Sequence, residues 1–107
     1  MFFTGVTVTF LKQFWYGLWL TFPLLASLAL GITLLGQIVA RHEGWSRFEG
    51  FYWSFITATT VGYGDFRPLR NKSRVIAIII AFLGLTLSGI IIAVAVEAAT
   101  VALGAHH

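Results

Sequence analysis

Two long uncharged stretches dominate the pattern of hydrophobic and polar positions along the chain. The first runs from Phe14 to Val39 without a charged residue over 26 positions, and the second from Val75 to Val96 over 22. A helix of about 20 apolar residues crosses a bilayer and satisfies its own backbone polar groups there. Both stretches are therefore predicted to be transmembrane helices, with buried core elements of a soluble protein as the alternative. Pro23 predicts a kink or a local break in the first helix.

The 35 residues between these stretches, Ala40 to Arg74, are not uniformly polar. Their middle part, Glu49 to Thr60, is rich in aromatic residues but too short to cross a bilayer. It is predicted to be a re-entrant helix that protein shields from lipid. The polar part from Arg67 to Arg74 contains Pro68 and Asn71, and it predicts an exposed turn before the second span.

Composition supports a membrane protein and excludes several other classes. Hydrophobic residues make up 58% of the 107 residues and charged residues 10%, against about 25% charged in soluble domains. The length allows one domain, and the absence of cysteine excludes disulfides and thiolate metal sites. The formal charge of +3 comes largely from one loop between apolar stretches, which argues against nucleic-acid binding. No catalytic acid–base pair, nucleophile motif or metal cluster is visible, so we expect neither an enzyme nor a cofactor.

The ends of the chain carry weaker signals. Met1 to Leu11 lacks the basic region and cleavage site of a signal peptide. We interpret it as an interfacial helix or as the tail of an upstream segment. His106 and His107 are interpreted as the remnant of a purification tag rather than as a metal site.

Residues Thr60 to Gly64 read TVGYG, the string of potassium-channel selectivity filters. In such a filter, backbone carbonyl oxygens replace the hydration shell of K⁺. Carbonyls that point the same way need a backbone of alternating hand, and Gly62 and Gly64 reach positive φ without a Cβ clash. The Thr60 hydroxyl adds a further layer of oxygen. Because one chain carries one filter segment, the active unit is predicted to be a homotetramer. A glycine-rich turn or a phosphate-binding loop is the alternative, although Arg67 stands where the dinucleotide-binding pattern has glycine.

The segment from Tyr52 to Asp65 resembles the pore helix and filter of two-transmembrane bacterial potassium channels, with a ligand-gated member among the possibilities. The resemblance extends through Pro68 and Arg74 to Gly84 and covers about residues 14–103. It implies an all-α membrane protein in which residues 1–107 form a single pore domain. The implied elements are an outer helix over about 14–40, a pore helix over 46–59, a filter over 60–64 and an inner helix over 74–103.

The resemblance also assigns roles to residues in and around the filter. It implies that K⁺, the permeant ion, binds at Thr60, Val61, Gly62, Tyr63 and Gly64. Tyr63 and Trp53 belong to an aromatic cuff around the filter. Asp65 corresponds to the acid that anchors the filter, and Tyr52 stands where the family has an indole partner for it. Ile56 stands where some relatives carry a glutamate that pairs with this acid, which predicts altered filter inactivation.

The second span is predicted to line the pore. In the family a glycine at the position of Gly84 is a hinge, and Gly89 is a second candidate, with close helix packing as the other explanation. Helical spacing from Leu85 places a series of residues on one stripe, which we expect to line the cavity and inner mouth: Leu85, Ser88 or Gly89, Ile92, Val96 and Thr100. Of these, Ile92 and Val96 are candidates for a hydrophobic constriction. Glu97 lies beside the stripe, either in a cation-attracting ring or extended to the interface.

Charged residues bear on two predictions, the behaviour of the outer mouth of the pore and the orientation of the protein in the membrane. Four copies of Arg67 would repel cations at the outer mouth and weaken block by external tetraethylammonium, unless Arg67 pairs with Asp65 or Glu49. The family orientation predicts a multi-pass protein of the cell membrane with the filter end outside and both termini in the cytoplasm. The positive-inside rule, applied to the six basic residues between Ala40 and Arg74, predicts the reverse.

The sequence leaves other partners and functions open. A cytoplasmic regulatory domain, absent from this chain, is a possible partner besides the bilayer and the other subunits. A potassium transporter subunit and a non-conducting membrane subunit remain alternatives. One intact filter unit argues against the first, and an intact TVGYGD against the second.

Overall fold

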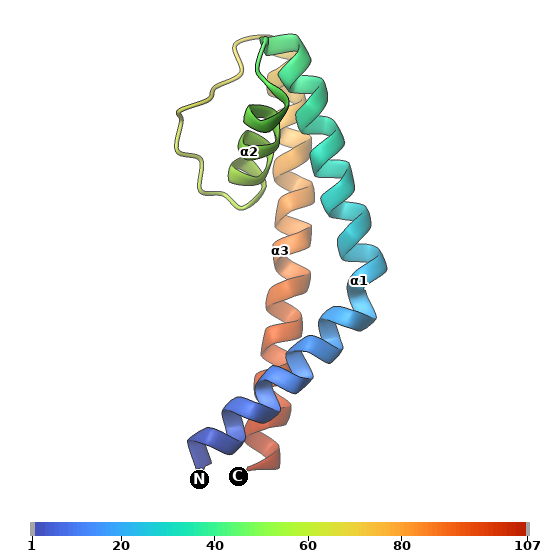
Figure 1. Cartoon of the computed structure of the whole chain (residues 1–107), viewed down its shortest axis with the longest axis vertical. Coiled ribbons are helices and arrows are strands. Elements are labelled where there is room, and N and C mark those ends of the chain that lie inside the picture. Colours follow the sequence, from blue (N-terminus) through green and yellow to red (C-terminus); the bar gives the residue numbers. More distant parts are fainter. Residues whose placement is uncertain (1, 107) are drawn as a thin grey trace. The chain divides into compact units, whose positions relative to one another are not determined.

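The computed structural model describes residues 2–106, which are all-α and contain three helices and no strand. Figure 1 shows α1 (Phe2–Glu43), the short α2 (Arg47–Ala58) and α3 (Asn71–Ala105) in that order. Met1 and His107 lie outside the described residues, so the interpretation of His107 as a tag remnant is not addressed. His106 is described, and its ring nitrogen Nε2 lies 2.7 Å from the Thr9 hydroxyl oxygen.

The two long helices are apolar enough and long enough to cross a membrane, at 42 residues for α1 and 35 for α3. Both extend beyond the predicted spans. The segment before Leu11 is continuous with the outer helix and not a separate element, because no residue there interrupts the helical hydrogen bonds. Helix α1 also continues through Pro23, so the local break is not present.

The chain divides into two compact units, and each is described separately. One unit contains the N-terminal part of α1, up to Leu25, and the C-terminal part of α3, from Gly89. Here the two helices approach closely at Gly17, where an added Cβ would lie 2.5 Å from Val94 Cγ1. Ala98 and Ala102 are buried in this unit.

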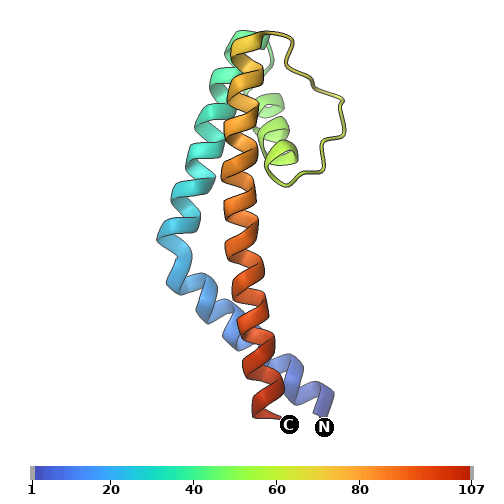
Figure 2. The same cartoon turned by 180° about the vertical axis from the view of Figure 1, so that it is seen from behind.

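The other unit, Ala26–Ser88, contains α2 and the segment that follows it. Its core is the cluster of Ile32, Val39, Trp53, Ala58 and Ile80, drawn from all three helices. Figures 1 and 2 show α2 beside the parts of α1 and α3 that belong to this unit, with the connecting segment running back along α2 to the start of α3.

Small residues let α2 lie close to both long helices. A Cβ added to Gly36 of α1 would lie 3.0 Å from the Gly50 carbonyl oxygen and 2.5 Å from the Ser54 Cβ. A Cβ added to Gly84 of α3 would lie 2.1 Å from the Ala58 carbonyl oxygen at the end of α2. Backbones at this distance leave no room for a side chain, so these glycines place the C-terminal end of α2 within the protein.

Carboxylate caps define where two of the helices begin. The Ser46 side chain accepts from the Glu49 amide at 3.1 Å, and the Glu49 carboxylate accepts from the Ser46 amide at 2.7 Å, which is a capping box for α2. Helix α3 is capped from a distance. Glu43, the last residue of α1, accepts from the amides of Leu69 at 2.5 Å and Arg70 at 3.3 Å, and from the Ser73 hydroxyl at 3.1 Å.

Candidate functional site

The segment after α2 has an alternating backbone. Its φ angle is +65° at Thr60, +54° at Gly62 and +83° at Gly64, and Thr60 is the one non-glycine with positive φ among the described residues. The intervening Val61 and Tyr63 therefore have negative φ. Alternation of hand at successive residues turns successive peptide planes the same way, which is the geometry required of a row of carbonyl ligands.

Positive φ at Thr60 is costly, because a β-branched side chain clashes with the backbone in this region. Strain of this kind amounts to about 1–3 kcal/mol and persists where the surroundings hold it. Two hydrogen bonds do so here. The Thr60 amide donates to the Thr57 carbonyl at 3.1 Å, and its hydroxyl donates to the Thr59 carbonyl at 2.6 Å.

The inner half of this segment is attached to the C-terminal turn of α2. The Gly62 amide donates to the Ile56 carbonyl at 3.2 Å, and the Thr59 amide to the Phe55 carbonyl at 2.9 Å. These bonds join the segment predicted to be the filter to the negative end of the α2 dipole, which favours a nearby cation.

Tyr52 and Asp65 meet beside the filter. The Tyr52 hydroxyl lies close enough to the Asp65 carboxylate to interact with it. Partial burial, together with this interaction and the charge of Asp65, raises the pKa of Tyr52. The carboxylate also accepts from the Phe66 amide at 3.1 Å. The phenol therefore reaches the acid from the position where the family has an indole, and Asp65 has a partner although residue 56 is isoleucine.

Several aromatic rings before, within and after α2 pack together in one chain. Trp53 is only 5% exposed, and its ring packs at 5.4 Å against Trp45, which in turn lies 5.4 Å from Phe66. Tyr63 is 71% exposed and has no ring contact among the described residues. Within one chain, Trp53 is therefore part of the core, and its ring packs against Trp45 and not against Tyr63. The role of Trp45 was not predicted from the sequence. The available signal was its position, because an apolar residue just before a capping box commonly packs onto the helix that follows.

Arg67 folds back over Gly64, the last residue of the predicted filter. Its Nε donates to the Gly64 carbonyl at 3.2 Å, and two guanidinium nitrogens lie 3.3 and 3.4 Å from the position of a Cβ on Gly64. The carboxylates considered as its partners are engaged elsewhere, Asp65 with Tyr52 and Phe66, and Glu49 with Ser46. The guanidinium thus bonds to the outermost filter residue, a contact that sequence reasoning did not anticipate.

The predicted stripe on α3 is largely exposed. Leu85, Ile92 and Val96 are 55–61% exposed. Thr100 is also exposed, Ser88 is half-buried, and Thr100 donates to the Val96 carbonyl at 2.9 Å. Gly84 is in tight contact with α2, whereas an added Cβ on Gly89 would meet nothing within 4 Å. The close-packing explanation therefore applies to Gly84, and Gly89 is sterically free.

Glu97 lies on another side of α3. It lines a hollow of about 420 Å³ together with Ile90, Ala93 and Val94 of the same helix and Gln13 and Tyr16 of α1. Glu97 thus borders a hollow between α3 and α1, and Ile92 and Val96 are not part of its lining.

Two long apolar helices, a short helix between them and a segment of alternating backbone hand define a class, the membrane pore module. A family model described as "Ion channel" matches residues 14–101, most of the chain. The chain therefore belongs to this ion channel family.

The curated relatives it matches are potassium channels. It is 42% identical over 67 residues to the TWiK family of potassium channels protein 7 of Caenorhabditis elegans, which covers 63% of this chain and 12% of the worm protein. It is 49% identical over 51 residues to human potassium channel subfamily K member 17, covering 48% and 15% of the two chains. Potassium channel protein 1 of Methanocaldococcus jannaschii is 38% identical over 53 residues, covering 50% and 16%. The chain spans less than a fifth of the length of these relatives, and no solved structure matches.

Proposed function

We propose that this chain is one subunit of a homotetrameric pore that conducts K⁺ selectively down its electrochemical gradient. The observation that carries the proposal is the alternation of φ at Thr60, Gly62 and Gly64 in a TVGYG segment. Four such segments around an axis supply a cage of carbonyl oxygens at each level, from Thr60 through Val61, Gly62 and Tyr63 to Gly64. A dehydrated K⁺ binds between levels and moves on when the next ion enters.

Apolar and aromatic surfaces that no part of this chain covers support a tetramer. The Tyr63 ring and the stripe of Leu85, Ile92 and Val96 are exposed although they are apolar or aromatic. A ring from a neighbouring subunit would brace Tyr63, while the Tyr52–Asp65 pair supports the filter from its own chain. The stripe would face the central cavity, with Ile92 and Val96 as the constriction and Gly89 as the hinge that lets the inner helix bend.

The membrane arrangement follows the family. The pore lies in the cell membrane with the filter end outside and both termini in the cytoplasm, where a regulatory domain joins it in longer channels. No cofactor is required, because the ligands of K⁺ are main-chain oxygens and the Thr60 hydroxyl.

Reconstitution of the chain into liposomes, with K⁺ and Na⁺ flux compared, tests the proposal. We expect K⁺ flux to exceed Na⁺ flux strongly, and Gly62→Ala to abolish it because alanine is strained at φ +54°. Gly104→Ala is the matched control, since a Cβ there meets nothing within 4 Å. Equal fluxes of the two ions would contradict selectivity. Flux that needs a second ion gradient would indicate a transporter instead.

A further inference from the structure

The hollow bordered by Glu97 lies between the N-terminal part of α1 and the C-terminal part of α3, within one compact unit. Its volume of about 420 Å³ falls in the range of about 300–1,000 Å³ that is usual for small-molecule sites. Gly17 and Val94 both line it, and an added Cβ on Gly17 would lie 2.5 Å from Val94 Cγ1. The hollow is therefore formed where two packed helices meet.

Glu97 brings an uncompensated negative charge to this hollow. It has no hydrogen bond or ion pair with any of the residues that the structure describes. Lys12 is the only lysine or arginine in this unit, and it does not line the hollow. A carboxylate on a membrane-spanning helix is costly and calls for a cationic partner. That partner is to be sought outside this chain.

The other polar groups of the lining can all accept hydrogen bonds. The Gln13 amide and the Tyr16 hydroxyl have no hydrogen-bond partner in the described part of the chain. The Thr21 hydroxyl donates to the Gly17 carbonyl at 2.8 Å, which leaves its oxygen as an acceptor. The Tyr16 ring adds a π face, which attracts a cation. Charge and hydrogen bonding together favour a cationic donor.

The rest of the lining is apolar and suits a hydrocarbon body. It includes Leu20 of α1 and Ile90, Ala93 and Val94 of α3. A bare metal ion is a poor fit, because Ca²⁺ takes about six to eight oxygen ligands and the described residues contain no group of three or more histidine, cysteine, aspartate or glutamate side chains that could hold one. An ammonium group attached to a compact apolar body matches both parts of the lining.

We propose that this hollow binds a small organic amine in its ammonium form. The ammonium donates to the Glu97 carboxylate and to the side-chain oxygen of Gln13. The apolar body lies against Leu20, Ile90 and Val94. The site depends on the packing of α1 against α3 and not on the filter, so it stands apart from the proposed conduction of K⁺.

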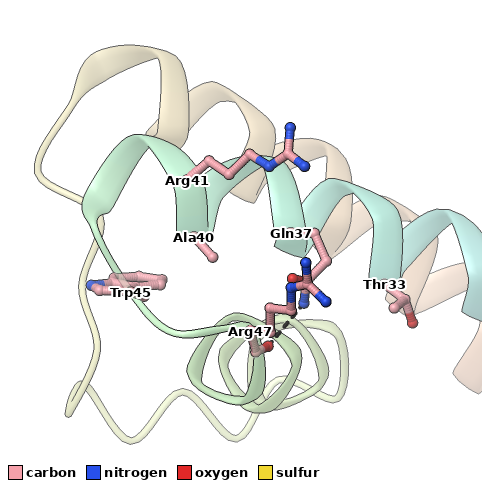
Figure 3. A pocket seen from close by; sticks show the side chains of 6 residues that line it. All are labelled: Thr33, Gln37, Ala40, Arg41, Trp45 and Arg47. Carbon is pink, nitrogen blue, oxygen red and sulfur yellow. Dashed lines mark hydrogen bonds between the residues drawn. The ribbon is translucent and has the colours of Figure 1, made fainter.

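The hollow of the other unit, shown in Figure 3, provides an internal comparison. It has a volume of about 470 Å³ and lies between the end of α1 and the start of α2. Its charged residues are Arg41 and Arg47, whose guanidinium groups lie apart, and the Gln37 amide donates to the Arg47 carbonyl at 2.9 Å. Positive charges repel an ammonium ion, so volume alone does not make a hollow of this protein an amine site.

Fluorine NMR of the full chain in a non-ionic detergent tests the site without measuring conduction. The probes are para-trifluoromethyl phenethylamine and the alcohol that carries a hydroxyl in place of the amine, with empty micelles as the blank. We expect the amine to bind more tightly than the alcohol. Glu97→Gln should weaken amine binding about tenfold, because a lost charge-assisted hydrogen bond has about this effect, and should leave alcohol binding unchanged.

Glu49→Gln is the matched control, because it removes the same charge outside the hollow and glutamine still closes a capping box. It should bind both probes like the wild type. Gln13→Glu provides a second variant should Glu97→Gln fail to fold. It keeps Glu97 and adds a carboxylate from α1, so it should tighten amine binding without affecting the alcohol.

Four outcomes would overturn the site. Three of them are equal affinity of the two probes for the wild type, an equal loss in Glu49→Gln, and unchanged amine binding in a Gln13→Glu protein that is folded by circular dichroism. The fourth is the absence of any amine binding, which would indicate that a neighbouring subunit fills the hollow. K⁺ flux is measured separately on the same protein, so failure of the channel function would be recognised independently.

Discussion

At the scale of single residues, the filter depends on a few backbone and side-chain bonds. Thr60 adopts positive φ at a cost that a glycine would avoid, but glycine has no hydroxyl oxygen to offer at this end of the predicted filter. At the other end, the Arg67 guanidinium takes the Gly64 carbonyl as its acceptor. The two ends of the segment are thus held differently, one by backbone bonds to α2 and the other by a charged side chain.

We predict that Arg67→Gln increases inward K⁺ current, most clearly at low external K⁺. The substitution removes a positive charge at the outer mouth and frees the Gly64 carbonyl for the ion. Whole-liposome or single-channel currents over a series of external K⁺ concentrations would measure the effect.

Two further variants separate the causes. Arg67→Lys keeps the charge but loses the planar fork that lies over Gly64, so it should resemble Arg67→Gln if the hydrogen bond dominates. Arg70→Gln removes a charge from the same loop without touching Gly64 and serves as control. Wild-type currents in all Arg67 variants would show that this contact has no role in conduction.

At the scale of elements, α2 is held by glycines on either side and by its capping box. The contacts of Gly36 with Gly50 and of Gly84 with Ala58 bring backbones together. Helix α3 depends on Glu43 for its first turn, although 30 positions separate Glu43 from Ser73. The start of the inner helix is therefore coupled to the end of the outer one, on the side where the filter lies.

We predict that Gly84→Ala lowers the stability of the protein by about 1–3 kcal/mol, the usual cost of overpacking, because its Cβ would overlap the Ala58 carbonyl. Gly89→Ala should be neutral or stabilise the helix by up to about 1 kcal/mol, since nothing lies within 4 Å and alanine favours helix. Thermal unfolding in detergent compares the two. If Gly89 is the hinge, Gly89→Ala also lowers open probability without lowering stability. Equal stability of Gly84→Ala and wild type would argue that α2 is not confined by α3.

At the scale of the whole molecule, the effect of the Glu97 charge on conductance depends on where the proposed tetramer places it. Glu97 lines the hollow with Gln13 and Tyr16, and the predicted pore residues Ile92 and Val96 do not. We predict that Glu97→Gln lowers conductance at about 10 mM salt but has little effect at about 0.15 M, because the screening length falls from about 30 to 8 Å. A ring of glutamates on the pore axis would lower conductance at both.

The matched control for Glu97→Gln introduces a carboxylate at Gln13, which lines the same hollow from α1. Adding Gln13→Glu to Glu97→Gln returns a carboxylate to the hollow and should restore conductance at low salt. Failure to restore it, together with a loss at both salt concentrations, would place Glu97 on the conduction path.

Much of the fold and part of the site were predictable from the sequence. Hydropathy predicted the two long helices, and a membrane protein of the ion channel family is confirmed. The short aromatic helix is present at Arg47–Ala58. The helix ends were less predictable. Helix α1 extends N-terminal to the predicted span because no helix-breaking residue lies there. Helix α3 begins at Asn71, where the Glu43 carboxylate accepts from the preceding amides. The roles of the individual filter and gate residues stay predictions.

The two apolar helices, the family and the positions of Gly62 and Gly64 follow from properties of consecutive residues: hydropathy, length and backbone freedom. The partners of the charged groups follow instead from how the chain folds in three dimensions. Glu43 caps the start of α3, Arg67 bonds to Gly64, and Arg41 and Arg47 are left facing a hollow. Those outcomes depend on distances between atoms of different elements, and no local pattern records which acid reaches a helix end first.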